Sequence, residues 1–138
     1  MRKKRQVGFT LIELLVVLTI LAMLAALVVP RVFRNLEKAK VNTTKAQIAA
    51  LESAIGTYRL EVGSFPTTDQ GLQALRVRPA GVDNWDGPYL PKDVPMDAWG
   101  HPYIYRCPSE HGDYEIISYG ADGREGGEGI DQDIVSWK

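Results

Sequence analysis

The residues that could do chemistry begin with a carboxylate in an unusual place. Glu13 lies four positions after Phe9, inside an apolar run that extends to Val29 and follows the basic stretch 2–5. A carboxylate near the middle of a bilayer costs roughly 2–4 kcal/mol or more, so we expect Glu13 to have a specific partner or function. The basic stretch should stay on the cytoplasmic side of a membrane.

A second group of such residues forms an acidic, glycine-rich segment near the C-terminus, densest over residues 122–133. Calcium prefers about six to eight carboxylate and carbonyl oxygens at about 2.3–2.6 Å, and glycines would let the backbone turn tightly enough to bring several together. The EF-hand pattern is not met, because its glycine and glutamate positions differ. Composition alone therefore favours the alternative, a solvated acidic loop without a metal.

The apolar run has the length of a membrane-spanning helix. Residues 9–29 would span roughly 31 Å at about 1.5 Å per residue, close to a hydrocarbon core of about 30 Å. An ordinary secretory signal peptide and a plain single-span anchor are the alternatives. The run exceeds a usual signal-peptide apolar region of about 7–15 residues, no A-x-A-like site follows it, and Glu13 interrupts it. We therefore expect residues 9–30 to form a transmembrane helix.

Residues 31–62 are expected to continue this helix as an amphipathic, soluble half. Its apolar residues recur at spacings of three and four and form one stripe: Ile48, Leu51, Ile55, Tyr58 and Val62. Gly63 is a natural C-terminal stop. Pro30 should kink the helix or melt a turn, because proline removes a backbone donor. A coiled coil is a weaker alternative, since the apolar repeat is short.

Residues 63–138 are expected to form a small α+β region. Residues 67–75 predict a short helix capped by Thr68 or Asp69, with Leu72 and Leu75 facing inward. Segments 102–106 and 114–119 flank a turn sequence and predict an antiparallel hairpin. The three tryptophans should act as large apolar anchors. A small antiparallel sheet packed on the long helix is the economical fold, of class α+β.

Composition and charge restrict the classes of function. Removing residues 1–8 would lower the formal net charge from −1 by four, to about −5, and no basic run lies elsewhere, so nucleic-acid binding has little support. The single cysteine, Cys107, excludes an intrachain disulfide. His101 and His111 lie in turn sequences, and common catalytic motifs such as G-x-S-x-G and H-E-x-x-H are missing. We therefore do not expect an enzyme.

The N-terminal pattern G-F-T-L-x-E at residues 8–13 resembles the signal of type IV pilins and pseudopilins. The resemblance implies that residues 1–8 are a leader, that a prepilin peptidase cuts between Gly8 and Phe9, and that the new N-terminus is methylated. It also implies that Glu13 pairs with the Phe9 amine of a neighbouring subunit during assembly. Such a pair would neutralise two charges in an apolar environment.

Four later motifs sharpen this resemblance. F-P-T-T-D-Q-G-L at 65–72, G-P-Y-L at 87–90, D-A-W-G-H-P-Y at 97–103 and S-Y-G-A-D-G at 118–123 are similar to the major pseudopilins of type II secretion systems. Ala98 departs from this family, which usually has proline there. The implied fold is type IV pilin-like, with a long N-terminal helix, a small antiparallel sheet and a C-terminal calcium-binding loop.

The resemblance also implies a ligand set for calcium, because major pseudopilins bind calcium where other pilins have a disulfide. Asp122 matches a family ligand, and Asp131 and Asp133 are the expected remaining carboxylates. The backbone carbonyls of Tyr119 and Ile130 are candidates to complete the coordination shell.

The implied function is that of a structural subunit that polymerises into the periplasmic pseudopilus and supports export of folded proteins across the outer membrane. Its expected partners are other copies of itself, minor pseudopilins, the inner-membrane secretion platform, prepilin peptidase and the membrane. Before assembly it would span the inner membrane once, with residues 63–138 in the periplasm. The alternative is a type IV pilus subunit, in which a disulfide-closed C-terminal loop would be expected.

Overall fold

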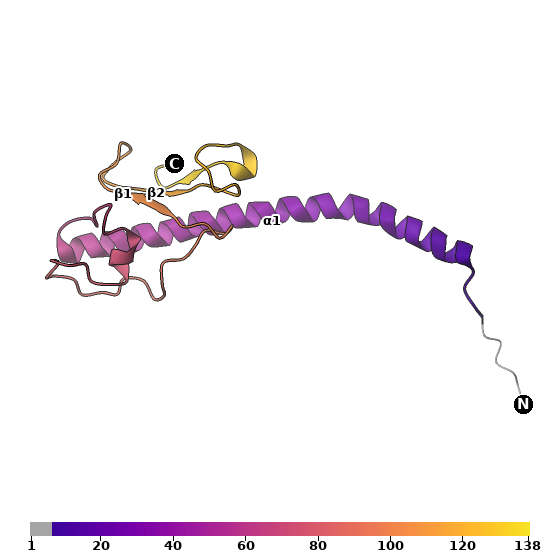
Figure 1. Ribbon diagram of the computed structural model, residues 1–138, viewed down its shortest axis with the longest axis horizontal. Coiled ribbons are helices and arrows are strands. Elements are labelled where there is room, and N and C mark those ends of the chain that lie inside the picture. Colours follow the sequence, from indigo (N-terminus) through magenta and orange to yellow (C-terminus); the bar gives the residue numbers. More distant parts are fainter. Residues whose placement is uncertain (1–6) are drawn as a thin grey trace, which may run out of the picture. The chain divides into compact units, whose positions relative to one another are not determined.

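The computed structural model describes residues 7–138 and has an α+β fold. Its elements are helix α1 (Leu11–Val62), 3-10 helix η1 (Leu72–Leu75), strand β1 (Ile104–Arg106), strand β2 (Glu115–Ser118), 3-10 helix η2 (Gly129–Asp131) and strand β3 (Ile134–Val135) (Figure 1). The chain divides into two compact units, one ending at Leu36 and the other Glu37–Lys138. The basic part of the predicted leader, residues 2–5, lies outside the described residues.

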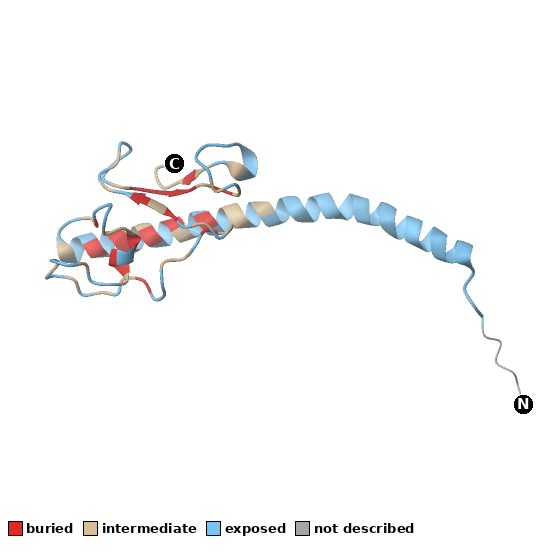
Figure 2. Cartoon of the chain, viewed as in Figure 1, coloured by how far each residue is buried: buried red, intermediate tan, exposed pale blue. Residues whose placement is uncertain are grey.

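The first unit consists mainly of the start of α1, which begins at Leu11. Its residues are exposed as far as Leu36, and Figure 2 shows this part of the helix uniformly in the exposed colour. By length and composition, α1 is long and apolar enough to cross a membrane. The helix continues through Pro30 without the melted turn that we considered, because a single missing donor leaves the neighbouring helical hydrogen bonds in place.

The second unit has its core along the other half of α1, where the predicted apolar stripe is confirmed. Ile48, Leu51, Ile55 and Tyr58 are at most 3% exposed, and Val62 packs against the same cluster. Burying one such side chain contributes about 1.5–3 kcal/mol. The opposing side of the core comes from η1 and the strands: Leu72, Leu75, Tyr105, Ile116 and Ile134.

The end of α1 also follows the prediction. The helix ends at Val62, and the next residue, Gly63, has a φ of 91°. Its N–H donates to the carbonyl of Arg59 at 2.8 Å, which satisfies one of the last helical carbonyls. A glycine is favoured here because a Cβ is strained at this φ.

The three strands form one antiparallel sheet in the order β1-β2-β3. Ile104 of β1 pairs with Ile117 of β2, so the predicted hairpin is confirmed. Ser118 of β2 pairs with Ile134 of β3. The third strand was not predicted, because its two residues are too few to show an alternating pattern.

A short helix forms within residues 67–75, as predicted, but it is a 3-10 helix of only four residues, and Gly71 precedes it without the predicted side-chain cap. Thr68 is unavailable as a cap because its hydroxyl donates to the carbonyl of Cys107 at 3.0 Å and accepts from the N–H of Cys107 at 2.9 Å. Leu72 and Leu75 are buried, as expected.

Two of the tryptophans are anchors of the kind predicted. Trp85 and Trp99 pack partly buried against the core, and each indole N–H has a partner. Trp137 stacks on the ring of His111 instead, with centroids 3.9 Å apart.

Candidate functional site

The predicted cleavage position lies in an exposed, non-helical segment before α1. Gly8 and Phe9 are both exposed, and nothing lies within 4 Å of where a Cβ on Gly8 would be. An exposed peptide without helical hydrogen bonds is accessible to a protease. The structure is therefore compatible with cleavage between these two residues, which stays a prediction.

Glu13 has a partner within its own chain. Its Oε2 accepts from the backbone N–H of Thr10 at 3.0 Å and from the Thr10 hydroxyl at 3.2 Å, while the Thr10 hydroxyl accepts from the N–H of Glu13 at 3.3 Å. This reciprocal arrangement is a capping box, and it satisfies donors at the start of α1. Our sequence reasoning missed it, although the spacing Thr-x-x-Glu is its signal. Pairing of Glu13 with a neighbouring Phe9 amine stays a prediction.

The acidic loop, residues 119–133, connects β2 to β3 and is closed by its own hydrogen bonds. The N–H of Ala121 donates to the carbonyl of Ile130 at 3.0 Å, and the N–H of Gly126 donates to Oδ2 of Asp133 at 2.9 Å. The first bond joins the two arms of the loop, and the second joins its middle to its last residue.

Two glycines let the backbone of this loop approach itself. A Cβ on Gly120 would lie 2.9 Å from the carbonyl oxygens of Asp131 and Gln132, and one on Gly127 would lie 2.6 Å from that of Asp131. Both glycines have positive φ, 68° and 95°. Because the backbone approaches itself closely here, the carbonyl oxygens of Asp131 and Gln132 lie together beside Gly120.

The predicted carboxylate ligands have different surroundings. Oδ1 of Asp133 is buried and has no hydrogen-bond partner, whereas Asp122 is exposed and its Oδ1 accepts from the N–H of Arg124 at 3.0 Å. Asp131 is half-buried at the end of η2. Across residues 7–138, no three His, Cys, Asp or Glu side chains gather as a group that could hold a metal ion.

The predicted carbonyl ligands both belong to the acidic loop. Tyr119 follows the end of β2 and is half-buried, with its hydroxyl 3.5 Å from Nη2 of Arg106. The carbonyl of Ile130 already accepts the N–H of Ala121. The structure thus places both residues near the closure of the loop, while the ligand set stays a prediction.

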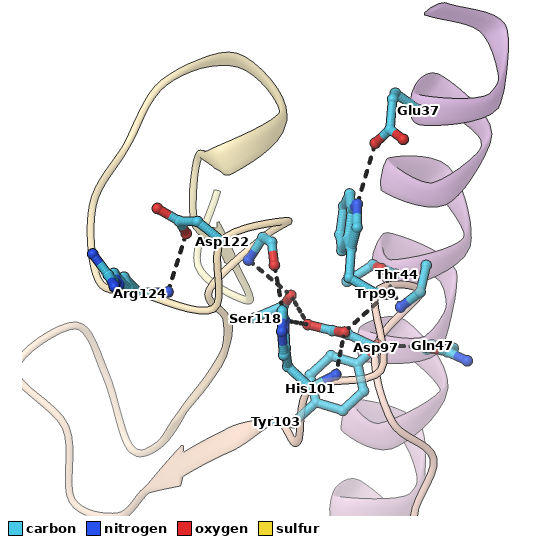
Figure 3. Close-up of polar contacts among 12 residues, drawn as sticks. Glu37, Thr44, Gln47, Asp97, Trp99, His101, Tyr103, Ser118, Asp122 and Arg124 are labelled. Carbon is cyan, nitrogen blue, oxygen red and sulfur yellow. Dashed lines mark hydrogen bonds and ion pairs between the residues drawn. The ribbon is translucent and has the colours of Figure 1, made fainter. Parts of the chain in front are cut away.

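Asp97 is a buried carboxylate that our site prediction did not include, and it joins the turn at residues 97–101 to the end of β2 (Figure 3). Its Oδ1 accepts from the N–H groups of Trp99 at 3.0 Å and His101 at 2.9 Å, and its Oδ2 accepts from the Ser118 hydroxyl at 2.6 Å. The adjacent N–H of Ala98 donates to the buried hydroxyl of Thr44 on α1 at 3.2 Å. The D-x-W spacing is a turn signal, but it does not reveal the distant partner.

Glu115 is a second buried carboxylate, and it is fully engaged. Oε1 accepts from Arg106 at 3.0 Å, and Oε2 accepts from the Ser109 hydroxyl at 2.7 Å and from Nδ1 of His111 at 2.9 Å. Burial raises the pKa of Glu115, but hydrogen bonds from Ser109, His111 and Arg106 together outweigh it and hold the pKa below its usual value. The Ser109 hydroxyl donates to the carboxylate and not to the histidine, so this is no nucleophile–base pair.

Comparison with known proteins agrees with these features. The family described as "Type II secretion system (T2SS), protein G" matches residues 31–137, and the "Prokaryotic N-terminal methylation motif" matches residues 3–29. The chain is 44% identical to type II secretion system core protein G of Pseudomonas aeruginosa, over 99% of both chains. It is 43% identical to that of Vibrio cholerae, over 99% of this chain and 94% of the relative.

A solved structure supports the same relationship. The major pseudopilin from the type 2 secretion system of enterohaemorrhagic Escherichia coli superposes with a TM-score of 0.66 at 35% identity. The match covers 76% of this chain and 92% of that chain.

The long N-terminal helix, the small antiparallel sheet and the methylation motif define the class, which is a type IV pilin-like subunit. Within this class, the chain belongs to the type II secretion system protein G family. It is a pseudopilus subunit that assembles with other secretion components, and the alternative of a type IV pilus subunit is less supported. The motif and the apolar helix indicate membrane anchoring.

Proposed function

We propose that this protein is the repeating subunit of a helical homopolymer and that its own role is structural, without catalysis. The main support for this proposal is the exposed apolar surface of α1 from Leu11 to Leu36, in a chain that matches the family along nearly its whole length. Such a surface is stable only in lipid or against other apolar helices. The inner membrane would cover it before assembly, and other copies would cover it in the filament.

Processing would precede assembly. Prepilin peptidase would cut between Gly8 and Phe9, and the Phe9 amine would be methylated. The exposed, non-helical segment and the match to the methylation motif support this step. The second unit would then face the periplasm, where minor pseudopilins and the inner-membrane platform would contact the growing filament.

Glu13 would set the register of neighbouring subunits by pairing with the Phe9 amine. In the unassembled chain the capping box with Thr10 gives this carboxylate a local partner, which lowers the cost of holding it in lipid. During assembly the charged amine of a neighbour would replace or join Thr10. Removing one partner of a buried ion pair costs about 3–5 kcal/mol, enough to prevent insertion of a subunit.

Mass spectrometry of filaments isolated from the periplasm of cells that express its secretion system, after the outer membrane is opened, tests the processing and assembly steps together. The proposal predicts sedimentable filaments whose subunit starts at Phe9 and carries one added methyl group. A filament made of subunits that retain residues 1–8 would contradict the processing step. A processed subunit that stays entirely in the membrane fraction would contradict polymerisation.

We also propose that the acidic loop binds calcium. The buried, unpartnered Oδ1 of Asp133 and the carbonyl oxygens gathered beside Gly120 fit a cation that prefers oxygen ligands. Asp133 would hold the ion together with Asp122, Asp131 and the carbonyls of Tyr119 and Ile130. Binding would offset the negative charge of the loop. A dissociation constant about a thousandth of the free calcium concentration would add roughly 4 kcal/mol to stability.

Thermal unfolding of the full chain in detergent, with calcium and with a chelator, tests this second proposal. Calcium should raise the melting temperature of the wild type, and Asp133→Asn should abolish the rise. Glu128→Gln is the matched control, because it removes one charge from an exposed position of the same loop and should keep the rise. A wild-type melting temperature that is the same with calcium and with the chelator would refute the calcium site.

A further inference from the structure

His101 contacts the acidic loop at the turn that presents Asp122. Its Nδ1 lies 3.1 Å from the carbonyl oxygen of Gly120. A carbonyl oxygen only accepts, so Nδ1 carries the hydrogen and donates. The imidazole thus supplies one hydrogen bond from outside the loop to the point where the loop leaves β2.

The same ring also packs on the other end of this turn. A Cβ on Gly123 would lie 3.0 Å from the His101 ring, so the ring rests against the backbone there. Gly123 has a φ of 64°, and Asp122 lies between the two contacts of His101. One side chain therefore touches residues 120 and 123, on both sides of Asp122.

His101 is itself held in place by the core of the second unit. Its backbone N–H donates to the buried Asp97 carboxylate, which also binds the hydroxyl of Ser118 at the end of β2. The Asp97 turn is attached to α1 through Thr44 and through the Trp99 indole, which donates to Glu37 at 3.2 Å. The donor that reaches the loop is thus fixed to the helix and the sheet.

We propose that His101 is a positioning residue whose hydrogen bond to the Gly120 carbonyl holds the acidic loop in its closed form. The bond from Ala121 to Ile130 can form only when the two arms of the loop meet, and the bond from Gly126 to Asp133 holds the middle of the loop against its last residue. The His101 bond fixes the first end relative to α1 and β2. Losing it leaves that end held by the longer hydrogen bond from the Gly120 N–H to the Ser118 hydroxyl, at 3.3 Å, so the loop opens more often.

Amide hydrogen exchange on the full chain in detergent, at one fixed pH and with a chelator present, tests this proposal. The reporters are the amides of Ala121 and Gly126, and the control is the amide of Tyr89, which donates to Leu75 at 2.8 Å in another part of the second unit. His101→Leu keeps the bulk and removes the donor. His101→Asn keeps a donor at the position of Nδ1 with less bulk.

We expect His101→Leu to speed exchange of the two loop amides about tenfold, the usual effect of one hydrogen bond, with Tyr89 unchanged. His101→Asn should stay close to the wild type. Unchanged loop exchange in His101→Leu would overturn the proposal. Equally faster exchange of the loop amides in His101→Leu and His101→Asn would also overturn it, because the effect would then come from lost packing of the ring. Equally faster exchange at Tyr89 would overturn it too, because the substitution would then destabilise the whole second unit.

Calcium titration by calorimetry gives a second readout, and this part rests on the proposed calcium site. His101→Leu should weaken calcium binding about five- to tenfold, because part of the binding energy would be spent on closing the loop. His101→Asn should bind like the wild type. If the wild type takes up no calcium, the calcium proposal fails, while the exchange experiment still decides the role of His101.

Discussion

At the scale of single residues, Glu13 and Glu115 show two ways in which this chain gives a carboxylate its partners. Glu13 is exposed at the start of a helix and bonds only locally, to Thr10, in the structure of one chain. Glu115 is 3% exposed and binds three side chains from β1 and the following turn. The first arrangement leaves room for a new partner, whereas the second is complete and stabilises the sheet.

Glu115 should make stability depend on pH. Its pKa in the folded protein is below the ordinary value of 4.5, so its contribution is fully present above that value and is lost as the pH falls through the lower folded pKa. Glu115→Gln should cost about 2 kcal/mol at neutral pH and should flatten the fall in stability under acid conditions. Urea unfolding over a pH series measures both effects.

The control for this experiment is Glu110→Gln, which changes an exposed carboxylate in the same turn. It should leave the unfolding free energy within about 0.5 kcal/mol of the wild type. If Glu115→Gln keeps the full acid dependence of the wild type, the three hydrogen bonds to Glu115 do not stabilise the folded state as described.

At the scale of elements, the acidic loop depends on glycine at particular positions. Gly120→Ala adds strain at a φ of 68° and a collision with backbone carbonyls at 2.9 Å, so we expect it to cost about 2–4 kcal/mol. Gly126→Ala is the matched control, because its φ of 88° is similarly strained but nothing lies within 4 Å of the new Cβ. Chemical unfolding measures the loss of stability in both variants. Equal losses would show that the close approach of the backbone at Gly120 does not add to the cost.

The contact between α1 and the Asp97 turn makes a second prediction at this scale. Thr44→Val keeps the shape of a fully buried side chain but leaves the N–H of Ala98 without a partner, so it should cost about 1–3 kcal/mol. Thr43→Val, at the exposed neighbouring position, is its control and should cost little. If both variants lose the same amount of stability, the loss comes from the change in helix propensity and not from the buried hydrogen bond.

The elements also show what could be predicted from the sequence. The stripe of Ile55 and Tyr58, the stop at Gly63 and the hairpin were predictable, because each depends on a local pattern of polarity or turn residues. The role of Asp97 was not, because its bond to Ser118 joins residues 21 positions apart and no local pattern records it. Asp133 was predicted as a ligand from the resemblance, but only the structure shows its unpartnered oxygen.

At the scale of the whole molecule, the two units differ in how they satisfy their apolar surface. The second unit, Glu37–Lys138, buries its own core, whereas the first exposes an apolar helix that a single chain leaves uncovered. A protein of this kind is complete only in a membrane or in a polymer. This difference, together with the family match, connects the fold to a pseudopilus subunit.

The most direct test of this account is protein secretion by the organism that carries this gene, with the chromosomal copy deleted and variants supplied on a plasmid. We predict that deletion traps the secreted proteins in the periplasm and that the wild type restores their release. Glu13→Ala should not restore release, although its second unit should keep the wild-type melting temperature. Thr19→Ala, which removes a hydroxyl bonded only to Leu15 in the same apolar helix, should restore release. Normal secretion in the deletion strain, or full restoration by Glu13→Ala, would contradict the account.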